Sequence, residues 1–271
     1  MTLRETLKEL APPFLLRTVR TAMGRGLRFK GAYTTWADAE KASGGYDNAE
    51  IIRRVLAAEL EVKKGKAADA RDGVTFDEMQ FSLSVMAALA RLSAGRQEPL
   101  RVLDLGGALG GLYRQYKAFV HGCGVSWTVV EQSALVDLGT VHFQTEELRF
   151  RTSLDEALAD GRYDVVLLSS VLQYLREPYD VIRRIALRQV PRIIVDRTPC
   201  SPLERDVLTV QRVPPEIYPA SYPCWIFSRR RLMGAFAPAF SVLSVFTDGS
   251  GEWHGPAVRF ELAGFILDRR S

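Results

Sequence analysis

The sequence predicts an α/β protein in which a mostly parallel, doubly wound sheet follows an α-helical N-terminal extension. Three observations support this prediction. From residue 101 onward, short β-rich apolar runs alternate with helical stretches, which is typical of parallel strands that helices cover on both faces. A glycine-rich turn follows the first of these runs. The last two runs are joined by a connection too short for a crossover helix, so the sheet is expected to end in an antiparallel pair.

The overall composition is that of an ordinary water-soluble globular protein. The 271 residues suit one large α/β domain with an attachment, and 47% hydrophobic with 25% charged residues is normal for such a chain. The net charge of +4 is mixed with acids along the chain, and no aromatic and basic stripe is present, so we expect no nucleic-acid partner. The three cysteines match no zinc spacing and the sequence shows no cluster of metal ligands, so we expect no metal and a reducing, cytoplasmic location.

Residues 1–97 are expected to form a helical extension or lid without strands. No apolar run approaches the roughly 18 residues that a membrane span needs. Pro12 and Pro13 interrupt the one apolar patch near the start, which does not fit a signal peptide. We predict a helical arm that packs on the domain, and a weak contact with an anionic membrane surface is the alternative.

Two amphipathic helices are predicted in this extension. Apolar residues recur at helical spacing in two stretches, residues 49–64 (Ile51, Ile52, Val55, Leu56 and Leu60) and residues 75–93 (Phe76, Met79, Leu83, Met86 and Leu89). Thr75 followed by Glu78 has the pattern of a capping box, so the second helix is expected to begin at Thr75.

Residues 98–271 are expected to form the main domain. Its five parallel strands are predicted from β-rich apolar runs at residues 101–107, 126–132, 148–153, 163–170 and 191–197. A long segment rich in Pro, Tyr and Trp follows, and we predict a substrate-cap insertion at about residues 198–227. A helix near residues 228–237 then precedes the last two strands, at residues 240–248 and 259–269.

The glycine-rich turn after the first strand predicts a cofactor site. Ligands of doubly wound sheets bind beyond the carboxyl ends of the strands, and Gly106, Gly107 and Gly110 stand at that place. Glycine lets the backbone approach a ligand closely, and the helix that follows offers free N–H groups. The turn fits both the dinucleotide fingerprint and the glycine-rich turn that holds S-adenosylmethionine. Ala108 replaces a glycine of both patterns, so the turn alone does not decide between them.

The surroundings of the turn favour the methyl donor. Asp104 can orient the turn and meet an ammonium group, whereas it would repel a pyrophosphate. Ser169 and Ser170 end the fourth strand, which in methyltransferases lines the methionine side of the pocket, although they could simply cap the following helix. The antiparallel ending of the sheet is usual for methyltransferases. Glu131, at the end of the second strand, would bind the ribose of either cofactor class.

On these residues, the chain resembles the class I S-adenosylmethionine-dependent methyltransferases over residues 100–270. It is more specifically similar to a poorly characterised bacterial family grouped with the methyltransferases and often associated with surface-polysaccharide gene regions. The resemblance implies a Rossmann-like, seven-stranded methyltransferase sheet, S-adenosyl-L-methionine as cofactor, and no particular substrate. The matching stretches are "GAYTTWADAEKASGGYD", "VLDLGGALGGLY", "VVEQ", "SSVLQYL", "VDRTP" and "YPASYPCWIFS".

The resemblance also implies roles for individual residues. The methionine side of the pocket would be formed by Asp104, Gly106, Gly107 and Gly110, together with Ser169 and Ser170. Glu131 would bind the ribose and Gln132 would lie beside the adenine. Ser153, after the third strand, would reach the adenine edge, where an acid or amide is usual, so this contact stays open.

Topology sorts the candidates for the acceptor side. His121 and His142 fall on the far side of the sheet, whereas His254 lies in the loop after the penultimate strand, which opens on the cofactor side if that strand runs parallel to the others. The fifth strand delivers Asp196 and Arg197 to this side. Polar and aromatic residues follow in the expected cap, and four more in the front region are expected to close the site from the opposite side. These residues are Gln211, Tyr218, Tyr222 and Trp225 in the cap, and Tyr33, Trp36, Tyr46 and Asp47 in front.

We therefore predict an S-adenosylmethionine-dependent methyltransferase that methylates an oxygen of a sugar or another small polar metabolite, with His254, Asp196 and Tyr222 as catalytic residues. An oxygen acceptor must lose its proton, and His254 or Asp196 would be the general base. One alternative is an NAD(P)-dependent oxidoreductase or epimerase. Its usual Tyr-x-x-x-Lys pair is matched by Tyr113 and Lys117, but these lie on the first helix, away from that chemistry. The other alternative is a non-catalytic scaffold. The sequence leaves the oligomeric state open.

Overall fold

The computed structural model describes residues 28–44, 48–214, 220–256 and 258–270. The expected arm within residues 1–27 lies outside the described residues, as do Tyr46, Asp47 and Tyr218. Within the described part of the chain, no helix is both long enough and apolar enough to span a membrane.

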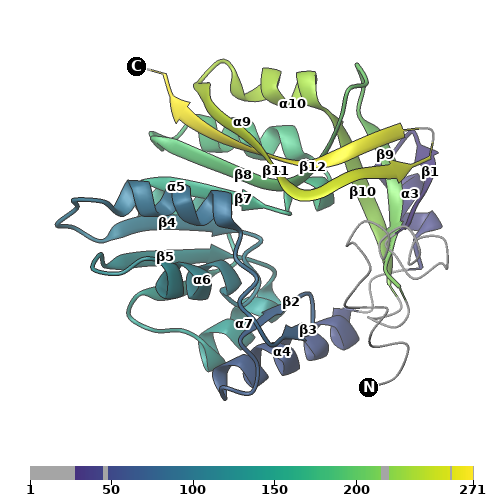
Figure 1. Ribbon diagram of the computed structural model, residues 1–271. Coiled ribbons are helices and arrows are strands. Elements are labelled where there is room, and N and C mark those ends of the chain that lie inside the picture. Colours follow the sequence, from purple (N-terminus) through teal and green to yellow (C-terminus); the bar gives the residue numbers. More distant parts are fainter. Residues whose placement is uncertain (1–27, 45–47, 215–219, 257, 271) are drawn as a thin grey trace, which may run out of the picture.

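A seven-stranded sheet forms the centre of the molecule, in the order β6-β5-β4-β7-β8-β12-β11. The first five strands of this order are parallel: β6 (Leu148–Arg151), β5 (Val125–Val130), β4 (Leu100–Leu105), β7 (Val165–Ser169) and β8 (Arg192–Ser201). β12 (Val258–Arg269) pairs antiparallel with β8, and β11 (Phe240–Gly255) pairs antiparallel with β12, so β11 runs in the direction of the parallel strands. The predicted fold class is confirmed, including the antiparallel last strand (Figure 1).

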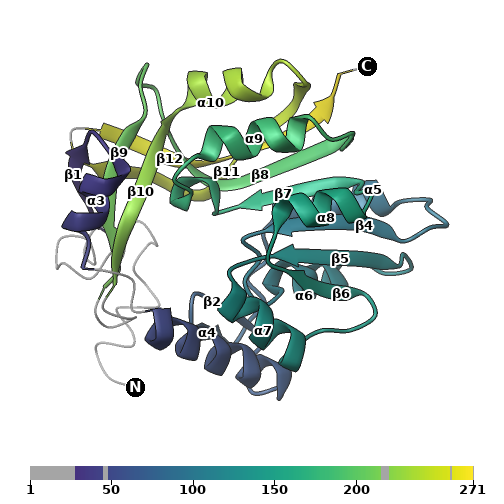
Figure 2. The same ribbon diagram turned by 180° about the vertical axis from the view of Figure 1, so that it is seen from behind.

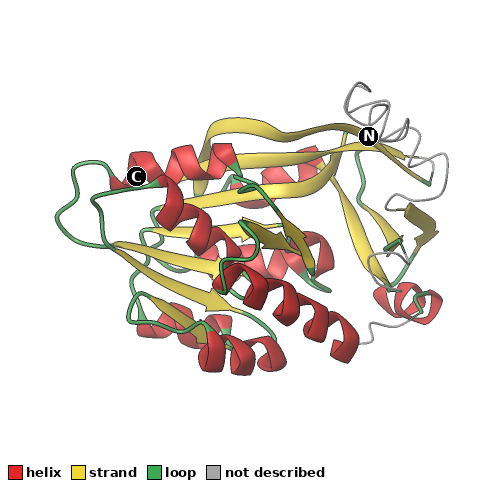
Figure 3. Cartoon of the chain, turned by 60° about the horizontal axis from the view of Figure 1, so that its bottom comes forward, coloured by secondary structure: helices red, strands yellow, loops and turns green. Residues whose placement is uncertain are grey.

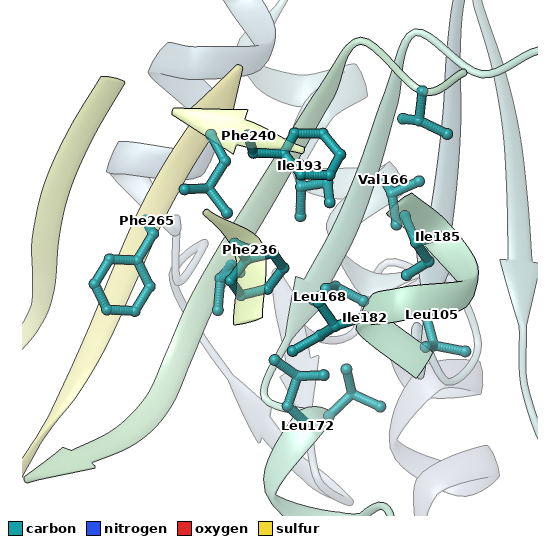
Figure 4. Close-up of a cluster of buried hydrophobic side chains, with 14 of the residues drawn as sticks. Leu105, Val166, Leu168, Leu172, Ile182, Ile185, Ile193, Phe236, Phe240 and Phe265 are labelled. Carbon is teal, nitrogen blue, oxygen red and sulfur yellow. The ribbon is translucent and has the colours of Figure 1, made fainter. Parts of the chain in front are cut away.

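Helices cover both faces of this sheet, as parallel strands require. α5 (Leu83–Ser93), α6 (Gly111–Phe119) and α7 (Ser133–His142) belong to one side, and α8 (Leu154–Asp160), α9 (Pro178–Ala186) and α10 (Arg229–Phe236) to the other (Figures 1 to 3). Successive strand residues point to opposite faces. Val166 and Leu168 therefore join the core under α8 to α10, shown in Figure 4, whereas Val165 and Leu167 join the core under α5 to α7.

Three further strands extend the sheet beyond the end of β7. The last register pair of β7 and β8 is Ser169 with Asp196, and β10 (Ser221–Ser228) pairs with the part of β8 that continues past this level. β9 (Val207–Arg212) pairs antiparallel with β10, and β1 (Arg28–Tyr33) pairs antiparallel with β9. The segment expected as an irregular cap at residues 198–227 is thus largely sheet, because the protruding end of β8 offers backbone groups that need partners.

The front region is also not purely helical, contrary to expectation. It contains α3 (Trp36–Ala42) and α4 (Asn48–Lys63), but also β1 and the hairpin of β2 (Asp69–Arg71) and β3 (Val74–Phe76). The prediction that a helix begins at Thr75 is wrong, because Thr75 lies in β3 and α5 begins at Leu83. The buried carboxylate of Asp69 accepts hydrogen bonds from the backbone N–H of Gln80 and from Gln115 Nε2, which holds the connecting segment extended.

The front region is tied to the main sheet through α6. Arg114 on α6 lies 2.6 Å from Glu59 Oε2 on α4 and 3.8 Å from Asp69 Oδ1 on β2. Burial raises the pKa of Glu59 more than the Arg114 charge lowers it. α4 and the β2–β3 hairpin therefore pack against the main domain, so that residues 69–84 reach the carboxyl edge of the sheet.

Candidate functional site

The carboxyl ends of the parallel strands bring the predicted cofactor residues to one edge of the sheet. Asp104 lies near the end of β4, Glu131 directly follows β5, and Ser169 ends β7 beside Asp196 of β8. Asp104 is paired in register with Val129 of β5 and Leu167 of β7, so the three strands end close together. This arrangement is the one expected from the topology of a doubly wound sheet.

The glycine turn is sterically specified at two positions. Gly106 has a φ of +74°, and a Cβ there would lie 2.6 Å from Val171 Cγ2. A Cβ at Gly107 would lie 2.5 Å from Asp104 Oδ2. Gly110, at a φ of +90°, precedes the first residue of α6. Ala108, which replaces a glycine of the sequence pattern, also has a positive φ, +47°, so the substitution preserves the shape of the turn at some conformational strain.

Asp104 lies beneath this turn and is fully buried. Trp127 Nε1 donates a hydrogen bond to Asp104 Oδ2 over 3.2 Å, and Oδ1 has no hydrogen-bond partner among the described residues. Burial raises the pKa of Asp104 to about 7, against a smaller lowering by the Trp127 hydrogen bond. Asp104 therefore packs against the turn at Gly107, and its role toward a cofactor stays a prediction. A hydrogen bond from a ligand to the unpartnered Oδ1 would offset the free-energy cost of burying this oxygen.

Glu131 connects the end of β5 to the glycine turn. Its Oε2 accepts a hydrogen bond from the Ala108 N–H over 3.3 Å, and its Oε1 accepts one from the Gln132 N–H over 2.9 Å. Burial raises the pKa of Glu131, opposed by these two backbone hydrogen bonds. Since a carboxylate has about four acceptor positions, both oxygens keep capacity for the hydroxyls of a ribose. The side chain of Gln132 is exposed at the start of α7.

Ser169 and Asp196 belong to a polar network at the ends of β7 and β8. Asp196 is 2% exposed, and its Oδ2 accepts hydrogen bonds from Ser169 Oγ and Ser82 Oγ, each over 2.9 Å. Arg197 Nη2 donates to Ser169 Oγ over 3.0 Å, and Arg197 Nε lies 3.4 Å from Asp196 Oδ2. The network holds the Asp196 carboxylate firmly at the predicted edge, and its role as a general base stays a prediction.

Ser170 is held in a strained turn next to this network. Its φ is +54°, and its N–H donates to the carbonyl of Asp196 over 2.9 Å. Gln173 Nε2 donates both to Ser170 Oγ, over 3.1 Å, and to the carbonyl of Arg197, over 3.3 Å. Left-handed backbone at a residue other than glycine persists only where its surroundings stabilise it, which is common at functional sites.

Tyr222 forms a second polar cluster with Tyr174 and Gln211. Tyr174 OH donates to Gln211 Oε1 over 3.1 Å, and Gln211 Nε2 donates to Tyr222 OH over 3.4 Å. The two tyrosine rings meet edge to face, with centroids 5.2 Å apart. Burial raises the pKa of the Tyr174 phenol well above its usual value. Tyr174 follows β7 in the 3₁₀ helix η1 (Leu172–Tyr174), so the cluster joins the carboxyl edge to strands β9 and β10.

His254 does not occupy the position expected of a general base. β11 does run parallel to β8, as the prediction required, but it continues past the cofactor level and His254 lies near the tip of the hairpin. His254 pairs with Arg259 of β12. Glu261, two residues further along β12, pairs with Cys200 of β8, which is four residues past Asp196. At about 3.3 Å per strand residue, His254 lies on the order of 20 Å from Asp196 along the sheet. Its side chain is 70% exposed, with Glu252 Oε1 3.8 Å from its Nε2.

The structure adds a role for Ser153 and corrects the expected position of two aromatic residues. Ser153 Oγ accepts a hydrogen bond from the Glu156 N–H, so this side chain caps α8, and its contact with the adenine edge stays a prediction. Tyr33 and Trp36 pack with Trp225 against β9, on the same side as the sheet extension, and do not close the site from the opposite side. The Trp36 and Trp225 rings lie 6.2 Å apart, and Trp225 Nε1 donates to the carbonyl of Leu175.

Trp127, Ser82 and Arg71 are among the residues of the site that were not found from the sequence. Trp127 lies in the buried apolar run of β5, and nothing in that run indicates that its indole N–H faces Asp104. Ser82 and Arg71 come from the front region, where the expected helix at residues 75–93 concealed the extended segment that places them beside Asp196 and Arg197. No local pattern in the sequence carries this information.

The fold is shared with a solved structure. The N-terminal domain of EvdMO1, crystallised with SAH bound, is similar to this chain with a TM-score of 0.50 and 19% identity, covering 83% of this chain and 98% of that chain. A structure of the same domain in the presence of SAH and D-fucose has a TM-score of 0.50 and 20% identity, with the same coverage. No protein-family model matches this chain, and no curated protein matches it.

Proposed function

We propose that this protein is an S-adenosylmethionine-dependent methyltransferase. The observation that carries the proposal is the buried carboxyl of Asp104 under the glycine turn, whose Oδ1 has no hydrogen-bond partner among the described residues and which suits an ammonium group but would repel a pyrophosphate. Glu131, which accepts a hydrogen bond from the Ala108 N–H of the same turn, would bind the ribose. The sheet around them ends in the antiparallel β11–β12 pair that methyltransferase sheets have and nicotinamide dehydrogenases usually lack.

The residues at this edge fit the cofactor. A side chain at Gly106 or Gly107 would clash with Val171 or Asp104, so the turn requires glycine there, and glycine is the residue that lets a backbone approach a ligand closely. Asp104 has a buried oxygen without a partner among the described residues, which suits an ammonium donor, and Glu131 suits two ribose hydroxyls. S-adenosylmethionine supplies an electrophilic methyl group, so the protein has mainly to align the acceptor and exclude water. Ser169 and Ser170 would line the methionine side, and Gln132 the adenine side.

The acceptor side lies between the network of Asp196 and the cluster of Tyr174, Gln211 and Tyr222. The phenol and amide groups of this cluster suit a polar acceptor with several hydroxyls, such as a sugar or a similar metabolite. The methylated atom would be an oxygen of that acceptor. The structure of the EvdMO1 domain in the presence of D-fucose is consistent with such an acceptor. We place the reaction in the cytoplasm, in the assembly of a surface polysaccharide.

Calorimetric titration of the purified protein with S-adenosylhomocysteine, and separately with NAD and NADP, tests the proposal. We expect micromolar binding of S-adenosylhomocysteine alone. Glu131→Gln removes a charge from the ribose position and should weaken this binding by about tenfold or more. Glu146→Gln, at an exposed position, is the matched control and should bind normally. Binding of a nicotinamide nucleotide, or of no nucleotide, would contradict the proposal.

The acceptor class is tested by formation of S-adenosylhomocysteine in the presence of free sugars and nucleotide sugars. Tyr222→Phe removes one hydroxyl from the acceptor side without emptying the space. We expect it to raise the KM for a sugar acceptor while the affinity for S-adenosylhomocysteine stays unchanged. An unchanged KM would exclude Tyr222 from the acceptor site.

A further inference from the structure

A pocket of about 330 Å³ lies beside the site, between the start of α5, the end of the parallel part of β8 and the bulge in β11. Its wall includes Arg71, Ser82, Ser84, Asp196, Arg197 and Asp248. None of the roles assigned above uses Arg71 or the β11 bulge. The pocket therefore shares Asp196 with the proposed acceptor side, and the proposed function leaves Arg71 without a role.

Two guanidinium groups line this pocket. Arg71 makes one hydrogen bond within the described residues, from Nη2 to the carbonyl of Gln80 over 2.9 Å, and a guanidinium has five N–H donors. Arg197 has a φ of +48°, and its buried Nε forms no hydrogen bond with the described residues. Burial, and next the charge of Arg197, lower the pKa of Arg71. Two like charges are held together here with most of the donors of Arg71 unused.

The acids of the pocket are already engaged. Oδ2 of Asp196 accepts hydrogen bonds from Ser82 and Ser169. Oδ1 of Asp248 accepts from the N–H and the hydroxyl of Ser250, over 2.9 and 2.5 Å. Asp196 also forms an ion pair with Arg197, whose Nε lies 3.4 Å from Oδ2, whereas Arg71 forms no ion pair with either carboxylate among the described residues.

The start of α5 adds to the positive character of the pocket. The first N–H groups of a helix have no acceptor within the helix, and the helix dipole favours a negative charge there. The first turn of α5 contains no acidic residue, and Ser82 at the N-cap makes no side-chain capping hydrogen bond because its hydroxyl donates to Asp196. The start of α5 and the two arginines, Arg71 and Arg197, line the same pocket.

We propose that this pocket binds a carboxylate or phosphate group, held by Arg71 and Arg197 at the N-terminus of α5. A planar guanidinium fork is the side chain best matched to such groups. The anion has two sources, the carboxylate of the methionine portion of the donor or an anionic group of the acceptor. The assignment to these sources rests on the proposed methyltransferase function, whereas the anion site itself does not.

Two measurements on wild type, Arg71→Gln and Arg197→Gln test the site. The first is calorimetric affinity for S-adenosylhomocysteine and for 5′-methylthioadenosine, which lacks the amino-acid portion. The second is the shift of Tm by inorganic phosphate, compared with sodium chloride at equal ionic strength. Arg91→Gln, at an exposed position toward the other end of α5, is the matched control. Far-UV circular dichroism checks that each variant is folded, and Arg→Lys at each position should restore part of the effect because the charge is retained.

If the anion comes from the donor, both Gln variants weaken binding of S-adenosylhomocysteine by about tenfold or more and leave 5′-methylthioadenosine unchanged. If it comes from the acceptor, S-adenosylhomocysteine binding is unchanged, and phosphate raises the Tm of the wild type and of Arg91→Gln but not of the two variants. Absence of both effects overturns the site. A wild type that is stabilised by phosphate but does not bind S-adenosylhomocysteine would retain the anion site and reject the methyltransferase.

Discussion

Ser82 donates a hydrogen bond from its hydroxyl to Oδ2 of Asp196 over 2.9 Å, although the two residues are 114 positions apart in the chain. Ser82 is the residue before α5, and Asp196 lies where β8 leaves its pairing with β7. This contact connects the front region directly to the carboxyl edge of the sheet. The front region is thus part of the site, since it supplies a side chain to the network that holds Ser169 and Arg197.

Ser82→Ala should lower the stability of the folded protein. The substitution removes a donor from the buried carboxylate of Asp196, and hydrogen bonds to charged groups contribute about 1.5–3 kcal/mol. We expect a loss of this size in the free energy of unfolding by urea. Ser84→Ala, two residues along the same pocket wall, should change it by less than about 0.5 kcal/mol. Equal effects of the two substitutions would show that the Asp196 contact does not contribute.

Asp104→Asn should remove part of the pH dependence of stability. The pKa of Asp104 is raised from 3.8 to about 7, so between these values the folded state holds a proton that the unfolded state has lost. The stabilisation from this carboxyl is therefore complete below about pH 4 and is lost as the pH rises through about 7.

The measurement is urea unfolding of both proteins between pH 4 and pH 8. The wild type should lose stability relative to Asp104→Asn by a few kcal/mol over this range. Asn keeps an oxygen acceptor for Trp127 Nε1, so the packing is matched. A constant difference between the two proteins across the pH range would contradict the raised pKa.

Gly107 and Gly111, near the two ends of the glycine turn, should differ sharply in their tolerance of alanine. A Cβ at Gly107 would lie 2.5 Å from Asp104 Oδ2, and this carboxyl is fully buried, so it has to shift away from Trp127. We expect Gly107→Ala to cost about 1–3 kcal/mol and to abolish measurable binding of S-adenosylhomocysteine. At Gly111 the nearest atom, Arg114 Nη2, is 3.9 Å from the added Cβ.

Gly111→Ala is therefore the control, and it should be neutral or stabilise the protein by up to about 1 kcal/mol, because alanine favours the helix. Thermal unfolding and calorimetry on the two variants give both readouts. Similar behaviour of the two would mean that the turn is not as closely packed as its geometry indicates.

The attachment of β1 to the sheet should depend on Phe29. Its ring meets Phe260 edge to face at 4.9 Å between centroids, beside the buried residues Val207 and Ile226. Phe29→Ala should loosen the strand, so we expect faster hydrogen exchange of the backbone amides in residues 28–33. Lys30→Ala, at the next and exposed position, should leave the exchange unchanged. Equal protection in both variants would show that backbone pairing with β9 alone holds β1.

The seven-stranded sheet was predictable because local sequence encodes it. Apolar runs such as residues 163–170 and 191–197 are long enough to fill a buried strand, and the short connection before residue 259 allows only an antiparallel pair. The positions of Asp104, Glu131 and Ser169 followed from the same reasoning, since every parallel strand of such a sheet ends at one edge.

The strands β1, β9 and β10 were not predictable in this way. These strands pair because β8 continues past the end of β7 and leaves a free edge. The local sequence of one strand does not indicate which other strand lies beside it. The same limit explains the error at His254. Its strand direction was correct, but the distance that β11 continues beyond the site is set by the sheet extension on which it packs.

By itself, the sequence determined the α/β class, the segments that form the central sheet with its antiparallel last strand, and the edge at which Asp104, Glu131, Ser169 and Asp196 meet. These depend on periodicity and turn chemistry, which are local properties of the chain. Only the tertiary structure decided that Trp127 holds Asp104, that Ser82 holds Asp196, and that Arg71 and Arg197 share a pocket. Such contacts join side chains from distant elements, and their geometry arises from how layers pack, because a hydrogen bond forms only where packing brings donor and acceptor within about 3 Å.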